Sequence, residues 1–292
     1  MNLPAQRDTP SYADLHLHSN YSDGSDSPER VVERAGALGF AMIALTDHDT
    51  LAGLGEAERA AEFHGVGFLP GVEISSQFQG TEVHVVGLGV NAGFGPLMAA
   101  LAEVRRQRHE RAVRIAAKLA KLGIEIDLAH LRSETQDLTL GRIHIARAIY
   151  AQGRCRTVQD AFDKYIGKDR PAYVPKAMLP IEESIYLIHG SGGLAFLGHP
   201  GIGHTLEKRL HVVLQLSFDG IEVYHTHHTA AQVSLFTMAA LENDLLISGG
   251  SDCHGTAKEE APEMGRVRIP YCHVERICQR LGRPAAGRPK RA

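Results

Sequence analysis

Seven short apolar segments recur along the chain, and each ends in or contains a polar group. They span residues 12–18, 41–48, 66–73, 82–90, 193–199, 220–225 and 245–252. Their length and their aliphatic and β-branched content predict buried β-strands. Segments with helical spacing lie between several of them, which favours a parallel sheet in an α/β fold.

The segment 27–38 illustrates the sequence signals from which the helices are predicted. Ser27 is a suitable N-cap, Pro28 is favoured in the first turn, and Gly39 is a suitable stop. Further helices are predicted at 51–63, 181–189 and 206–216. We expect the strands to close into a barrel, because polar groups at so many strand ends would then meet at one rim. An open doubly wound sheet is the alternative.

The strand–helix alternation stops between residues 96 and 168. This segment contains a predicted long helix at 97–122, with arginines at 105, 106, 108, 111 and 114, and shorter helices at 141–152 and 158–165. It predicts a helical insert over 96–168 that caps a barrel formed by 1–95 and 169–283. The arginines are expected to form a solvated face or to attract an anionic substrate. The basic tail at 284–292 is predicted to be flexible.

Composition narrows the class of protein. The 292 residues, 43% of them hydrophobic, suffice for one large domain or a domain with an insert. A net charge of −3 argues against general coating of nucleic acid or membranes. No apolar run approaches the roughly 20 residues of a membrane span, and residues 1–12 lack a signal-peptide core. The four cysteines show no CxxC spacing, so we expect reduced thiols and a cytoplasmic protein.

Histidine is the unusual residue, with 17 in the chain. His16 and His18 share one face of a predicted strand, and two such imidazoles can hold one metal ion. Asp23 follows in a turn rich in serine, aspartate and glycine, where Asp26 has the same surroundings but is not expected to bind metal. Most of the other predicted strands also carry a histidine or a carboxylate at or near one end.

These polar groups form one candidate metal-binding set. Its members are His16, His18, Asp23, His48, Glu73, His84, His199, Asp252 and His254. So many polar and charged groups cannot be buried together without cations. Because an open catalytic zinc site uses about three protein ligands, the set predicts two or three ions, of the Mn, Fe, Zn or Mg kind. Asp14 and Asp47 are expected to orient imidazoles, and Cys253 to point into packing.

The motifs that carry these residues resemble those of the polymerase and histidinol phosphatase (PHP) superfamily. They are HLHSNYSDGS, LTDHD, GVEIS, EVHVVGLGV, LGHP and GGSDCHG, in that order. Two further segments, GRIHIARAIY and KYIGKDRPAYVPK, are similar to a branch acting on nucleoside 3′,5′-bisphosphates and on short RNA from its 5′ end. The resemblance implies a distorted (β/α)7 barrel with a helical insertion domain and three divalent ions, often Mn²⁺.

The resemblance also implies roles for individual residues. All nine candidate ligands match ligand motifs, and Glu73 falls at the bridging carboxylate. Catalytic roles are expected for Asp23, His48, Glu73, His199 and His225. Either His225 or His228 is expected to contact a phosphate or to donate a proton to the leaving oxygen. Substrate contacts are expected from Arg142, His144, Lys168, Arg170, His225 and His228. Arg142 and His144 open a helix, where backbone N–H groups favour anions.

The expected activity is hydrolysis of the 3′-phosphate of a nucleoside 3′,5′-bisphosphate by a metal-bound hydroxide. The alternatives are 5′–3′ exoribonuclease activity on short RNA, and another phosphatase activity such as that on histidinol phosphate. A third alternative is a metal-stabilised accessory module without activity, but no ligand is missing from the motifs. The expected partners are a small nucleotide or the 5′ end of a short RNA, and not a membrane.

Overall fold

The structure is a computed structural model that describes residues 11–134, 140–203, 206–255 and 263–285. Its strands are β1 (Tyr12–Leu17), β2 (Met42–Leu45), β3 (Gly67–Phe78), β4 (Thr81–Leu88), β5 (Leu179–Pro180), β6 (Leu194–Leu197), β7 (Gly220–His225), β8 (Leu246–Gly250) and β9 (Ile269–Pro270). They form one sheet in the order β8-β7-β6-β4-β3-β2-β1-β9, with β5 beside β3. The seven predicted strands are all present, and the two-residue strands β5 and β9 were not predicted.

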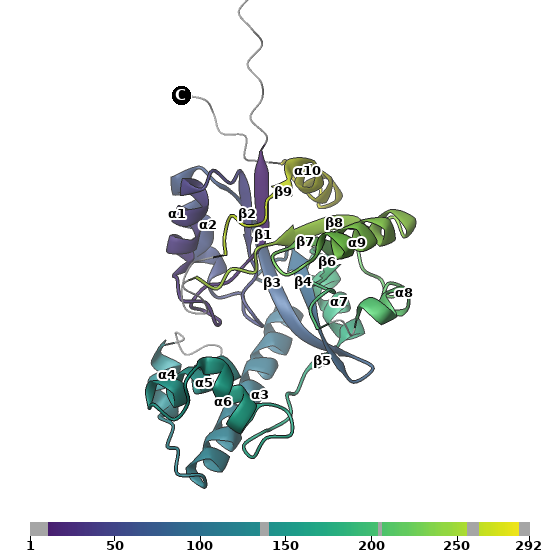
Figure 1. The fold of residues 1–292 in the computed structure, drawn as a ribbon. Helices are drawn as coiled ribbons and strands as arrows, with labels where there is room; N and C mark the ends of the chain where they lie inside the picture. The colour runs from purple at the N-terminus through teal and green to yellow at the C-terminus, as the bar shows by residue number, and fades with distance from the viewer. Residues whose placement is uncertain (1–10, 135–139, 204–205, 256–262, 286–292) are drawn as a thin grey trace, which may run out of the picture.

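The sheet curls until β8 approaches β1 (Figure 1). The chain following β8 runs parallel to β1, with a bridge between Leu17 and Cys253. The backbone N–H of His18 donates to the carbonyl of Cys253 at 3.1 Å, and that of Asp252 donates to His16 at 3.0 Å. These bonds nearly close the sheet into a barrel, which confirms the predicted α/β barrel against the open-sheet alternative.

The barrel is not entirely parallel, and this corrects the expectation from the sequence. Only Gln79 and Gly80 separate β3 from β4, and both have positive φ, 48° and 78°. A two-residue turn of this kind joins antiparallel strands only. Accordingly, β4 runs antiparallel to both β3 and β6. His84 therefore lies within an antiparallel strand, opposite Ser75 of β3.

Helices cover the barrel at α1 (Pro28–Ala37), α2 (Leu54–His64), α7 (Ile181–Gly190), α8 (Leu210–Val213), α9 (Ala230–Glu242) and α10 (Tyr271–Arg280). The side chain of Ser27 caps α1 as predicted, by accepting from the N–H of Arg30 at 3.2 Å. The helix predicted at 206–216 is instead the 3-10 turn η2 (Glu207–Arg209) followed by the short α8. None of the helices within the described residues combines the length and apolar character that crossing a membrane requires.

Two apolar clusters share the barrel strands. Met42 and Ala44 belong to a cluster that includes residues of α10, whereas Ile43 belongs to a cluster that includes residues of α1, α2, α7 and α9. Neighbouring residues of one strand thus pack on opposite faces of the sheet. Both faces are buried, as the near-continuous apolar strands predict.

The chain between β4 and β5 forms α3 (Gly95–Ala120), α4 (Leu128–Glu134), α5 (Arg142–Ala151), α6 (Val158–Ala161) and the π-helix η1 (Phe162–Ile166). The first half of α3 packs on the barrel through Leu97 and Leu101, whereas its second half joins a separate apolar cluster through Ile115 and Leu119. Figure 1 shows these helices beyond one end of the barrel. The separate cluster supports an insert near 96–168, although it also includes Val174. Of the predicted flexible tail, residues 286–292 lie outside the described residues.

Candidate metal centre

Glu73 of β3 lies at the centre of the histidine cluster. Its Oε2 is 3.3 Å from His16 Nε2 and 3.2 Å from His18 Nε2. The same oxygen is 3.0 Å from His48 Nδ1. Its Oε1 is 2.5 Å from His84 Nδ1 and 2.9 Å from His199 Nε2. One carboxylate, 1% exposed, thus contacts imidazoles from several segments of the chain.

Three groups of side chains have their potential donor atoms within 4.8 Å of one another. They are His18, Asp23, His48 and His254; His16, His18, Glu73 and Asp252; and His48, Glu73 and His84. His18, His48 and Glu73 each belong to two of these three groups. His199 joins them through Glu73 and through a contact of 3.2 Å between its Nε2 and His84 Nδ1. The structure therefore brings all nine predicted residues into one cluster.

The backbone is strained where it presents some of these groups. Of the nine residues, His199 and Asp252 have positive φ angles of 22° and 55°, and Asp49, which follows His48, has a φ of 53°. Such conformations cost free energy in non-glycine residues and persist only where surrounding contacts impose them. At His199 one such contact is the carboxylate of Glu222, which accepts from the His199 N–H at 2.9 Å.

The carboxylates of the cluster attract positive charge strongly. Burial favours neutral imidazoles, yet nearby carboxylates raise the pKa of His18 to about 9, through Asp252 and Glu73. Burial also opposes ionisation of Glu73, yet His48, His84 and His16 hold its pKa well below the usual range. In His48 burial prevails and lowers the pKa to about 4, so this imidazole is neutral at pH 7, as metal binding requires.

These residues fit a group of divalent cations. Glu73 Oε2 is buried and has no hydrogen-bond partner among the described residues, although imidazole nitrogens lie beside it. His16 Nε2 and His18 Nε2 are 3.0 Å apart, close to the roughly 3.4 Å that separates two ligands of one tetrahedral ion. Mixed imidazole and carboxylate donors suit Mn²⁺, Fe²⁺ and Zn²⁺.

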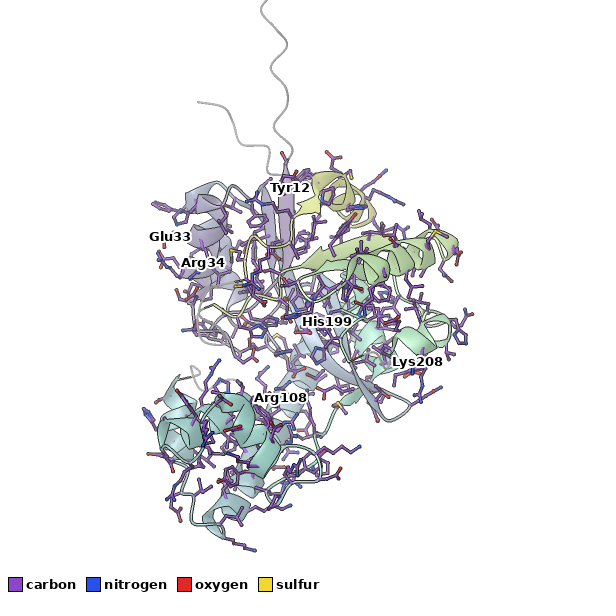
Figure 2. All side chains as sticks on the ribbon, in the orientation of Figure 1. Tyr12, Glu33, Arg34, Arg108, His199 and Lys208 are labelled. Carbon is purple, nitrogen blue, oxygen red and sulfur yellow. The ribbon has the colours of Figure 1, made fainter. Side chains whose placement is uncertain are left out.

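A cavity with a basic wall opens beside this cluster. It measures about 200 Å³ and is lined by Asp23, His48 and His84 on the cluster side. Arg108, Arg111, Arg142 and Lys176 also line it, and we call it the basic cavity. Figure 2 shows Arg108 on the part of α3 nearest the barrel.

The basic side chains differ in their partners. Arg108 pairs with Asp49 at 2.5 Å, and Lys176 pairs with Glu82. The guanidinium of Arg142 lies over the Phe162 ring, 5.6 Å from its centroid. Burial and the positive charges of Arg142 and Arg108 lower the pKa of Arg111 to about 10. An anion bound in the cavity would relieve this repulsion.

The arginines of α3 divide between the two predicted alternatives, a solvated face and a surface that attracts an anion. Arg106 is exposed and pairs with neighbouring glutamates, as the first alternative expects. Arg105, in contrast, donates to the carbonyl of Asp49 at 2.8 Å, and Arg108 and Arg111 line the basic cavity. Because α3 crosses from the insert onto the barrel, one side of the helix faces the cluster.

The predicted substrate-binding residues are dispersed. Arg142 lines the basic cavity, whereas His144 is buried on the next part of α5 and lines a second cavity. Lys168 and Arg170 are exposed and line neither cavity, so the structure gives their predicted substrate contacts no support.

His225 and His228 follow β7 but have different surroundings. His225 Nε2 lies 3.5 Å from Asp252 Oδ2 and has no hydrogen-bond partner among the described residues, so its predicted catalytic role stays a prediction. In His228, Nδ1 donates to the carbonyl of Val223 at 2.9 Å, and Nε2 accepts from the N–H of Gly201 at 3.2 Å. Both ring nitrogens are used, so the predicted substrate contact of His228 is wrong. His228 instead holds the loop that follows His199.

A family model described as the PHP domain matches residues 14–165, more than half of the chain. The chain belongs to the PHP family. The relatives of this PHP chain include a 3′,5′-nucleoside bisphosphate phosphatase of Chromobacterium violaceum, which is 37% identical over 82% of this chain and 86% of its own. A 5′-3′ exoribonuclease of Haemophilus influenzae is 36% identical over 82% of this chain and 89% of its own.

Among solved structures, a protein of Bifidobacterium adolescentis described as a metal-dependent phosphoesterase superposes with a TM-score of 0.84. It is 29% identical, and the match covers 93% of this PHP chain and 98% of that protein. These comparisons confirm the resemblance found in the motifs. They place the chain among the metal-dependent phosphoric ester hydrolases of the PHP family.

The structure also identifies partners in the PHP cluster that sequence reasoning missed. Glu222, fully buried, has Oε1 2.9 Å from His16 Nδ1 while its Oε2 accepts from His199. The signal was a carboxylate within the apolar segment 220–225. Asp14 and Asp47, expected to orient imidazoles, instead accept from Ser251 and from Ser19 and Ser22. These two aspartates hold loops in place, so that expectation is wrong. Cys253 is buried in an apolar cluster, as expected.

Proposed function

We propose that this PHP protein hydrolyses the 3′-phosphate of nucleoside 3′,5′-bisphosphates and releases a nucleoside 5′-phosphate and inorganic phosphate. The observation that carries the proposal is the basic cavity, which joins the histidine cluster to Arg108, Arg111, Arg142 and Lys176. A substrate with one phosphate on each side of a ribose has an anionic group for each of these two regions. Two phosphates on one small molecule therefore match the charge distribution of the cavity.

We further propose that the nine residues of the cluster hold three divalent cations, with Mn²⁺ the best candidate. Such cations supply a water of lowered pKa and neutralise charge on the phosphoryl oxygens. Glu73 is suited to bridge between them, because its two oxygens face different histidines.

The remaining residues act on the substrate in this proposal. Arg111 and Arg142 hold the second phosphate by charge-assisted hydrogen bonds. His225 holds a proton at Nε2 for the leaving oxygen, because that nitrogen faces the cluster and has no hydrogen-bond partner among the described residues. Asp23 and His48 line the basic cavity on the side of the histidine cluster, and in this proposal they hold a cation beside the reacting phosphate.

The second candidate function is 5′–3′ exoribonuclease activity on short RNA. It is supported by the Haemophilus influenzae relative, which is 36% identical. Release of a 5′-mononucleotide from 5′-phosphorylated RNA breaks the same bond between ribose O3′ and phosphorus. The two reactions therefore differ only in whether the departing phosphate carries a further nucleoside.

A product assay tests the proposal. The protein is incubated with Mn²⁺ and adenosine 3′,5′-bisphosphate, and nucleotides are separated by chromatography while inorganic phosphate is measured. The expected products are AMP and phosphate in equal amounts, with histidinol phosphate left intact. Formation of adenosine 3′-phosphate would refute the proposed position of cleavage. Mononucleotides from short RNA, with the bisphosphate left intact, would replace the first candidate by the second.

A further inference from the structure

The helix α3 belongs to both parts of the molecule. Leu97 and Leu101 pack in the barrel cluster, whereas Ala112 and Ile115 pack in the separate cluster of the insert. Residues 102–111, all of them within the described part of the chain, belong to none of the apolar clusters. This stretch lies where the two parts meet, and its arginines contact the barrel through polar groups.

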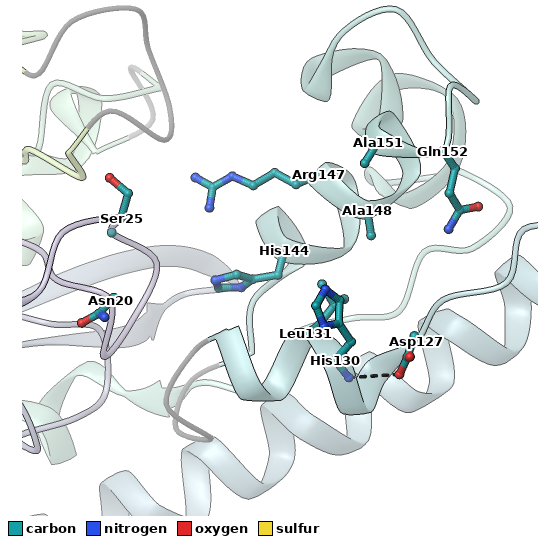
Figure 3. Close-up of a pocket in the computed structure, with 11 residues that line it drawn as sticks. Asn20, Ser25, Asp127, His130, Leu131, His144, Arg147, Ala148, Ala151 and Gln152 are labelled. Atoms are coloured by element: carbon teal, nitrogen blue, oxygen red, sulfur yellow. Dashed lines mark hydrogen bonds between the residues drawn. The ribbon is translucent and has the colours of Figure 1, made fainter.

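The second cavity interrupts the packing between the two parts at α5. It measures about 560 Å³, and Asn20 and Ser25 of the loop after β1 line it together with His144 and Arg147 of α5. Figure 3 shows the loop and α5 on opposite sides of it. Because the parts are separated there, the contacts made by α3 contribute more to their relative position.

Asp49 is the barrel residue on which the polar contacts of α3 converge. It is fully buried, and its Oδ2 lies 2.5 Å from Arg108 Nη2. Arg105 donates to its backbone carbonyl at 2.8 Å. Arg108 Nη2 also donates to Ser75 Oγ at 2.8 Å, and the N–H of Ser75 donates to Asp49 Oδ1 at 2.9 Å. Two arginines on one face of α3 are thus fixed to a single barrel residue.

Asp49 also joins the backbone that presents the candidate metal ligands. It directly follows His48, and its N–H donates to the carbonyl of Glu73 at 2.9 Å. On the side of the insert, Arg111 follows Arg108 by about one turn of α3 and lines the basic cavity. Asp49 therefore connects the histidine cluster to the helix that carries part of the basic wall.

We propose that Asp49 is a positioning residue that sets the separation between the histidine cluster and the basic side chains of the insert, and thereby the preference for a substrate with two phosphates. This inference rests on the proposed function. A substrate of fixed length bonds to both regions only when their separation matches it, because hydrogen bonds weaken steeply in poor geometry. A substrate with one phosphate depends on the cluster alone.

Two variants separate position from charge. Asp49→Asn removes a negative charge and Arg108→Met removes a positive one, yet both break the same ion pair, and asparagine tolerates the φ of 53° at this position. Each is assayed with Mn²⁺ on adenosine 3′,5′-bisphosphate and on adenosine 3′-phosphate, which lacks the 5′-phosphate. The ratio of kcat/KM for the first substrate to that for the second should fall about 10–100-fold in both variants, because a misplacement of about 1 Å can cost about 100-fold. The double variant should lose no more than the more impaired single variant.

Asp219→Asn is the matched control. Its carboxylate also accepts from a backbone N–H, that of Ala195 at 2.8 Å, and contacts a basic ring, that of His189 at 2.7 Å, but it does not line the basic cavity. Its ratio should equal that of wild type. Hydrogen exchange measured by mass spectrometry gives a readout independent of activity: the amides of residues 102–111 should exchange faster in Asp49→Asn than in Asp219→Asn.

The outcomes distinguish the explanations. A ratio that rises in Asp49→Asn and falls in Arg108→Met would leave Asp49 only the neutralisation of Arg108, and would overturn the proposal. An unchanged ratio in Asp49→Asn, or an equal loss on both substrates, would overturn it as well. If the wild-type protein releases no phosphate from the bisphosphate, the proposed function fails. Hydrogen exchange then still tests whether Asp49 holds α3, and unchanged exchange would reject that role.

Discussion

Glu222→Gln perturbs the cluster while leaving all nine candidate ligands in place. The carboxylate uses one oxygen for His16 Nδ1 and the other for the N–H of His199, both at 2.9 Å. Glutamine is nearly isosteric but has a single acceptor oxygen and a donor NH2. If its oxygen serves His199, its NH2 faces His16 Nδ1 and favours the tautomer in which Nε2 carries the proton. A protonated Nε2 cannot bind a metal ion.

The magnitude follows from the bonds that change. If the glutamine oxygen serves His16 instead, two donors face each other at His199, where the backbone is already strained. A hydrogen bond to a charged group contributes about 1.5–3 kcal/mol, so losing one corresponds to a factor of about 10–100 in an equilibrium constant. Substitution of residues that orient metal-bound histidines typically lowers metal affinity by a similar factor. We therefore expect Mn²⁺ affinity to fall about 10–100-fold.

The assay is calorimetric titration of the metal-stripped protein with Mn²⁺, with circular dichroism to verify folding. Glu242→Gln on the exposed side of α9 is the matched control and should leave affinity unchanged. An affinity of Glu222→Gln within twofold of wild type would show that Glu222 does not determine the tautomer of His16. Glu222→Ala should destabilise the fold more severely, by about 2–6 kcal/mol, because it leaves two buried donors without an acceptor.

Three further perturbations test the site. Asp23→Ala should abolish phosphate release and lower the amount of bound metal measured by elemental analysis. Asp26→Ala in the same loop removes a carboxylate that pairs with Arg34, and should retain turnover within about twofold. Equal activity of the two variants would remove Asp23 from the site. Arg142→Ala should raise KM about 10–100-fold in steady-state phosphate release with little change in kcat, because a charge-assisted hydrogen bond to phosphate is lost. Arg170→Ala is the control and should leave KM unchanged. An unchanged KM in Arg142→Ala would give Arg142 a structural role. Protein stripped of metal by a chelator should gain roughly 5–10 °C in Tm, measured by differential scanning calorimetry, when Mn²⁺ is added at about 100 times the Kd of the Mn²⁺ complex. An unchanged Tm would argue against cations that bind the folded cluster.

The candidate ligands could be read from the sequence because their signals are local. His16 and His18 alternate along one strand, and His48, His199 and Asp252 follow apolar segments directly. Residue type and the period of a strand suffice to predict that such groups gather at one place. The barrel followed from the same kind of pattern, because apolar periodicity reflects which faces are buried.

Other features depend on which segments pack together. The antiparallel direction of β4 rests on the turn at Gln79 and Gly80, which the expectation of a parallel sheet overlooked. Arg108 and Arg111 face the basic cavity because α3 lies against the barrel, and helical spacing alone cannot say what a polar face meets. His228 looked like a substrate contact until both of its nitrogens were found to bond to backbone.

The sequence by itself indicated the chemistry of this protein, since nine imidazoles and carboxylates in or beside the predicted strands suit a cation-binding cluster in a barrel that gathers them. Only the tertiary structure decided how that cluster is held and what surrounds it. Glu222 contacts His16 across 206 residues of chain, and the two cavities arise where the insert meets the barrel. Such contacts depend on the packing of distant elements, which no local pattern of residues encodes.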